Sequence, residues 1–128
     1  MKSRIDASFI LLVLAQGLHS VEEYVGRLWD VFLPAQLVSA LASDNLEVGF
    51  LTLNIALFVF GLICWLVFNR FTSAFIWFWI VLETVNGISH MFFALLRMAY
   101  FPGLITAPIL LVLAIKLFRV QQLVDKSS

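Results

Sequence analysis

FLTLNIALFVFGLICWLVF, residues 50–68, decides the fold class of this chain. Thr52 and Asn54 are its only clearly polar members. A helix rises ~1.5 Å per residue, so about 20 mostly apolar residues cross a hydrocarbon layer ~30 Å thick. The stretch therefore has the length and the composition of a membrane-spanning helix.

The composition of the whole chain points the same way. Of its 128 residues, 62% are hydrophobic and 12% are charged. Soluble domains carry about 25% charged residues, and this chain has too few polar side chains to cover a water-exposed surface. Its eight basic and eight acidic residues cancel, so no basic field indicates nucleic acid as a partner. The single cysteine, Cys64, excludes an intrachain disulfide framework.

Three further segments reach spanning length, which predicts an all-α, four-helix transmembrane bundle. We expect one membrane domain over residues 1–128, with spans over about 5–29, 46–68, 71–97 and 102–121. The residues AQLVSALA predict a short amphipathic helix at the membrane interface, between the first and second spans. The N-terminal sequence MKSRIDASFILLVLAQG also fits a secretory signal peptide, which is the alternative to a first span.

The placement of basic residues predicts that both termini are cytoplasmic. Cytoplasmic loops of membrane proteins carry an excess of Lys and Arg. With four crossings, Arg27 and Arg97 fall toward the outer side. The remaining basic residues share the side of the termini: Lys2, Arg4, Arg70, Lys116, Arg119 and Lys126.

Two polar patches interrupt the first and third spans. In each, polar side chains lie three, four or seven residues apart and so share one face of a helix. Counted at ~1.5 Å per residue from the cytoplasmic ends of the spans, both patches lie at one depth in the outer half of the bilayer. We therefore expect them to meet between the helices. The patches are HSVEE, with His19, Glu22 and Glu23, and ETVNGISH, with Glu83, Asn86 and His90.

These residue types predict a metal site. A charged group at the centre of a spanning helix costs about 2.5–3.5 kcal/mol, and neighbouring carboxylates repel unless they are protonated or neutralised by a cation. Imidazole and carboxylate are ligands of zinc, iron and manganese. We expect one or two such divalent ions, and a glutamate left uncoordinated, Glu23 or Glu83, as the catalytic base. The expected ligands are His19, Glu22, Glu23, Glu83 and His90, with Asn54, Asn86, Arg97 and Tyr100 around them.

Taken together, the motifs resemble the HXXEE-motif membrane protein family. That family is marked by an H-x-x-E-E motif, a further histidine and a Y-x-P-G motif. Here they appear as HSVEE, as NGISH ending in His90, and as YFPG with Tyr100, Pro102 and Gly103. The resemblance implies a small integral membrane protein with a metal site, and it implies no particular reaction. Tyr100 also suits a place in the outer interface belt.

The leading functional hypothesis is a metal-dependent enzyme, a hydrolase or an oxidoreductase, acting on a membrane lipid or another hydrophobic small molecule. A transport protein for metal ions or protons is an alternative, although the inner half of the bundle is almost wholly apolar. A metal-free acid–base isomerase using the same Glu and His residues is another. In a purely structural network, Arg97 would neutralise a carboxylate across the bundle. The sequence indicates no oligomeric state.

Overall fold

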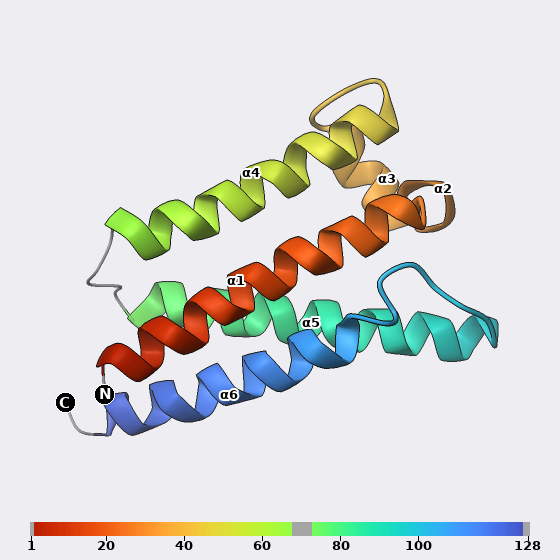
Figure 1. Ribbon diagram of the computed structural model, residues 1–128. Coiled ribbons are helices and arrows are strands. Elements are labelled where there is room, and N and C mark those ends of the chain that lie inside the picture. Colours follow the sequence, from red (N-terminus) through yellow and green to blue (C-terminus); the bar gives the residue numbers. More distant parts are fainter. Residues whose placement is uncertain (1, 68–72, 127–128) are drawn as a thin grey trace.

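The computed structural model describes residues 2–67 and 73–126, and over these ranges it contains helices and no strand (Figure 1). The predicted all-α fold class is confirmed. The helices are α1 (Lys2–Val25), α2 (Leu28–Val31), α3 (Leu33–Ala40), α4 (Leu46–Val67), α5 (Ser73–Arg97) and α6 (Ala107–Asp125).

Four of these helices contain segments long and apolar enough to cross a membrane. The segments are Ile5–Val25, Leu46–Leu66, Ala74–Arg97 and Ala107–Asp125. The chain thus has the architecture of a multi-pass membrane protein. The expected end of the second span at 68, the start of the third at 71, and Arg70 lie outside the described residues.

Two of the spans differ from the expected ranges for local backbone reasons. The helix α1 ends at Val25, before residue 29, because Arg27 adopts a left-handed backbone conformation with φ 54°. The helix α6 begins at Ala107, after residue 102, because Gly103 has φ 95° and directs the chain into a loop. Neither conformation belongs to an α-helix.

A short helix, α3, is present where the interfacial helix was expected, beside the Leu46 end of α4 (Figure 1); its place at a membrane interface stays a prediction. It exposes Leu33 and Leu37, one turn apart, as an apolar face. Its opposite side packs closely on α4, since a Cβ atom at Gly49 would overlap the carbonyl group of Ser39. This packing fixes α3 against the bundle.

The helix α1 lies between α4 and α6, and α5 packs along α6 (Figure 1). The start of α1 and the end of α6 lie at the same end of the bundle (Figure 1); a cytoplasmic location of the termini stays a prediction. Two apolar clusters fill the interior, one toward the start of α1 and the end of α6, and one around α2 and the Arg97 end of α5. The polar residues of α1 and α5 lie between these clusters.

Candidate functional site

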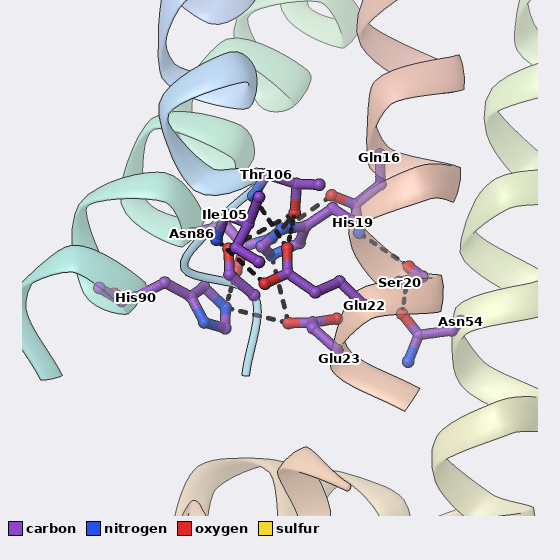
Figure 2. Close-up of polar contacts among 12 residues, drawn as sticks. Gln16, His19, Ser20, Glu22, Glu23, Asn54, Asn86, His90, Ile105 and Thr106 are labelled. Carbon is purple, nitrogen blue, oxygen red and sulfur yellow. Dashed lines mark hydrogen bonds and ion pairs between the residues drawn. The ribbon is translucent and has the colours of Figure 1, made fainter. Parts of the chain in front are cut away.

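The helices α1 and α5 bring His19, Glu23 and His90 together (Figure 2). Glu23 Oε1 lies 3.3 Å from His19 Nε2 and 3.0 Å from His90 Nε2. One possible ligand atom from each residue lies within 4.8 Å of the other two. The three residues are 0%, 5% and 2% exposed, respectively. We call this buried group the triad.

The triad distances suit a metal ion and also suit hydrogen bonds. Two ligand atoms held at ~2.0–2.1 Å from a tetrahedral ion are about 3.3–3.4 Å apart, close to the separations of 3.3 and 3.0 Å. The 3.0 Å separation also falls in the range of N–H···O hydrogen bonds, whereas His19 Nε2, at 3.3 Å, makes no hydrogen bond within the described residues. The two imidazole rings are nearly perpendicular, at 85°, with centroids 4.6 Å apart. Two nitrogens and one oxygen therefore converge on one point.

Glu22, next to Glu23 in the chain, is directed to the loop between α5 and α6. Its Oε1 accepts hydrogen bonds from the Tyr100 hydroxyl (2.8 Å) and the Ile105 N–H (3.0 Å). Its Oε2 accepts from the Thr106 N–H (2.8 Å) and the Thr106 hydroxyl (2.6 Å). Partial burial and the hydrogen bond to Glu22 raise the pKa of the Tyr100 phenol, which keeps it a donor. Glu22 thereby fastens the start of α6 to α1.

Glu83 is fully buried, with 0% exposure. Within the described residues neither of its carboxylate oxygens meets the geometry of a hydrogen bond, and Asn86 is a polar neighbour. Glu83 lies seven residues before His90 on α5, or ~10 Å along the axis. The structure does not place it in the triad.

A chain of hydrogen bonds leads from the triad across α1 to α4. The Asn86 side-chain oxygen lies 3.1 Å from His90 Nε2, and its amide N–H donates to Gln16 (3.4 Å). Gln16 donates to the Ser20 hydroxyl (3.2 Å), which donates to Asn54 (2.7 Å). Asn86 therefore contacts the triad directly, whereas Asn54 is connected to it through three side chains, those of Asn86, Gln16 and Ser20.

Ser20 and Asn54 also line a groove of about 460 Å³ between α1 and α4. The rest of its lining is almost entirely apolar. Figure 2 shows these two residues on the α4 side of α1 and His90 on the other side. The groove is thus separated from the triad by α1 itself.

Arg97 lies apart from the triad. Its guanidinium donates to the Val31 carbonyl (2.6 Å) and lies over the Phe101 ring, 5.3 Å from its centroid. Phe101 in turn packs against His90, with centroids 5.5 Å apart. Arg97 therefore joins the end of α5 to α2 and touches His90 only through Phe101.

The YFPG motif covers the two histidines. A Cβ atom at Gly103 would lie 2.6 Å from His90 Nδ1 and 2.7 Å from His19 Cε1. A Cβ atom at Gly26 would likewise lie 2.6 Å from Pro102. Because Gly103 has no side chain, the loop backbone can lie directly against both imidazole rings.

The sequence model of a family described as "protein of unknown function with HXXEE motif" matches residues 10–117. The chain belongs to this family. The resemblance drawn from the motifs is thereby confirmed, and the matched range includes the triad and the loop before α6. No curated protein and no solved structure matches the chain.

Two further polar residues of this HXXEE-family chain were not among the predicted site residues. Thr106 Oγ1 lies 2.6 Å from His19 Nδ1, and no spacing rule connects a residue just before α6 with one on α1. Gln16 precedes His19 by three residues and so shares its helix face. That spacing was a usable signal for Gln16.

Proposed function

We propose that this protein is a membrane metalloenzyme in which His19, Glu23 and His90 hold one divalent ion. The observation that carries the proposal is the convergence of their three ligand atoms within 4.8 Å, fully buried between helices of spanning length. Burying these groups is costly, and an ion bound by all three would offset that cost. Two histidines and one carboxylate are the ligands of many catalytic zinc sites and of non-haem iron sites.

The ligand count favours a catalytic site over a structural one. Structural zinc sites are usually closed by four protein ligands, whereas three leave a position open. When bound, such an ion supplies Lewis acidity toward a carbonyl or phosphoryl oxygen, and iron adds redox chemistry. Zinc, iron and manganese all suit these ligands.

We propose one ion because the other carboxylates are engaged or distant. Both oxygens of Glu22 accept two hydrogen bonds each from the loop before α6. Glu83 lies outside the group of converging ligand atoms. Its buried oxygens lack hydrogen-bond partners within the described residues, so we propose that Glu83 exchanges a proton with the substrate rather than binding the ion.

The proposed substrate is a membrane lipid or another hydrophobic small molecule. The triad lies within Ile5–Val25 and Ala74–Arg97, segments apolar enough to cross a membrane. A substrate that reaches this layer does so most readily from the bilayer. Toward the chain ends, buried apolar side chains such as Phe9, Leu12 and Trp79 fill the interior. That filling favours an enzyme over a carrier, because an ion path needs polar groups along its length.

A metal-free acid–base isomerase is the second candidate. The separation of 3.0 Å also allows Glu23 to accept a hydrogen bond from His90 without any ion, with His19 Nε2 3.3 Å away. Glu83 and the triad would then exchange protons directly with the substrate.

Metal content of the detergent-purified protein tests the proposal. The wild type, incubated with zinc, iron(II) or manganese and then desalted, should retain about one equivalent of ion by mass spectrometry. His19→Ala, His90→Ala and Glu23→Gln should retain none. Glu47→Gln is the matched control, because Glu47 pairs with Tyr24 away from the triad. If the folded wild type retains no ion, the metalloenzyme fails and the isomerase is favoured; two equivalents would contradict the single-ion site.

A further inference from the structure

We infer that Thr106 sets the tautomer of His19, as the middle member of a Glu22–Thr106–His19 relay. Thr106 Oγ1 lies 2.6 Å from His19 Nδ1 and 2.6 Å from Glu22 Oε2. Figure 2 shows the threonine beside the His19 and Glu22 side chains of α1. Thr106 is a positioning residue, since it acts on the triad through His19.

The hydrogen count of the relay decides its direction. Even without the Thr106 hydroxyl, Glu22 accepts hydrogen bonds from three donors, the Tyr100 hydroxyl and the N–H groups of Ile105 and Thr106, which is the behaviour of an ionised, acceptor-only carboxylate. The single hydroxyl hydrogen of Thr106 therefore points to Glu22 Oε2, which is 2.6 Å away. The backbone carbonyl of Gly103 is the more distant acceptor, at 3.4 Å. The Thr106 oxygen must then accept from His19, so Nδ1 of His19 carries a hydrogen.

In this tautomer the lone pair of His19 Nε2 is directed toward Glu23. In a neutral imidazole with its hydrogen on Nδ1, Nε2 is an acceptor. His19 Nε2 is buried, lies 3.3 Å from Glu23 Oε1, and makes no hydrogen bond within the described residues. Two acceptors that face each other are suited to a cation between them. The relay thus prepares His19 to coordinate through Nε2.

The arrangement assigns a role to Glu22 as well. Metal-ligating histidines generally donate their other N–H to an oxygen acceptor, which fixes the tautomer and raises the basicity of the ligand. Here the acceptor is a threonine hydroxyl polarised by the Glu22 carboxylate. Glu22 therefore acts on the same ion as Glu23 without binding it.

This inference rests on the proposed metal site, so its test has one readout that needs no metal. In ¹⁵N-labelled, metal-free protein, the His19 Nδ1–H should give a slowly exchanging NMR signal in wild type and in Thr106→Ser. In Thr106→Val, which keeps the side-chain shape but lacks the hydroxyl, that signal should be lost, because Nδ1 then has no acceptor and the hydrogen moves to Nε2, which lies 3.3 Å from Glu23. An Nδ1 without hydrogen in the wild type would overturn the inference.

The second readout is zinc affinity, measured by competition with a chromophoric chelator. Thr106→Val should weaken binding about 10- to 100-fold, and Thr106→Ser should restore it. Thr52→Val, an exposed position on α4, is the control for the loss of a threonine hydroxyl and should bind as wild type. Equal affinity in both Thr106 variants would refute the relay. An Nδ1–H signal in a wild type that binds no zinc would support the relay and overturn the proposed metal site.

Discussion

Replacing Gly103 with alanine should displace the histidines of the triad, although Gly103 is not one of its members. The backbone of Gly103 has φ 95°, a conformation that costs a residue with a side chain about 1–2 kcal/mol. The added methyl carbon would also lie 2.6 Å from His90 Nδ1 and 2.7 Å from His19 Cε1. Real Cβ contacts do not reach such distances, so the loop or the imidazole rings must move.

The two rings have little freedom to yield. His19 is held by Thr106 and Glu23, and His90 by Asn86 and Glu23. Forcing a methyl group into such a packed region costs about 1–3 kcal/mol. Together with the backbone term, Gly103→Ala should lose about 2–5 kcal/mol of unfolding free energy. Displacement of either ring should also weaken metal binding.

Reversible unfolding in mixed detergent micelles measures the first effect, and chelator competition measures the second. Gly87→Ala is the matched control, because a Cβ atom there would meet the Ala107 carbonyl at 3.1 Å, a tight contact that a shift of a few tenths of an ångström relieves. Alanine is also the better helix former by about 1 kcal/mol, so this control should stay near wild type. If Gly103→Ala matched Gly87→Ala in stability and in zinc affinity, the loop would not lie against the histidines as described.

Three further changes test other parts of the molecule. Glu22→Gln replaces one acceptor oxygen by an NH₂ group that faces two donors. It should lower the unfolding free energy by about 1–3 kcal/mol and so lower the unfolding temperature. An unchanged temperature would contradict the four-donor arrangement. Arg97→Ala removes the hydrogen bond to the Val31 carbonyl and the contact with the Phe101 ring. The variant should be less stable by about 1–2 kcal/mol and should still bind the ion. A loss of metal content would show that Arg97 belongs to the site. Zinc at 100 times its Kd should raise the unfolding free energy of the wild type by about 2.7 kcal/mol, and a chelator should abolish this gain. An equal gain in His90→Ala would show that zinc binds at another site.

Most of the fold could be predicted from the sequence because membrane insertion leaves few options. In the hydrocarbon layer, an apolar run such as residues 50–68 must form its backbone hydrogen bonds within itself. A helix does this, with a known rise per residue. Depth and helical phase then bring His19 and Glu23 to the level of His90. The structure shows these three side chains in contact, as expected from that count.

The loop between α5 and α6 could not be predicted in the same way. It has no helical period, so spacing gives neither the contact of Thr106 with His19 nor that of Gly103 with both rings. The positive φ of Arg27 ends α1 early, and no pattern in the sequence requires it there. The expectation that Arg97 surrounds the ligands rested on its register on α5. In the structure its long side chain reaches the Val31 carbonyl instead.

The pair Glu22–Glu23 shows how one motif serves two elements. Successive residues on a helix point about 100° apart, so adjacent glutamates cannot face the same partner. Glu23 is four residues from His19 and faces His90 on α5. Glu22 is three residues from His19 and faces the loop before α6 instead. There it accepts hydrogen bonds from the N–H groups of Ile105 and Thr106 and from the Thr106 hydroxyl. The spacing H-x-x-E-E thus allows α1 to supply two groups of the triad and, through Thr106, to orient one of them.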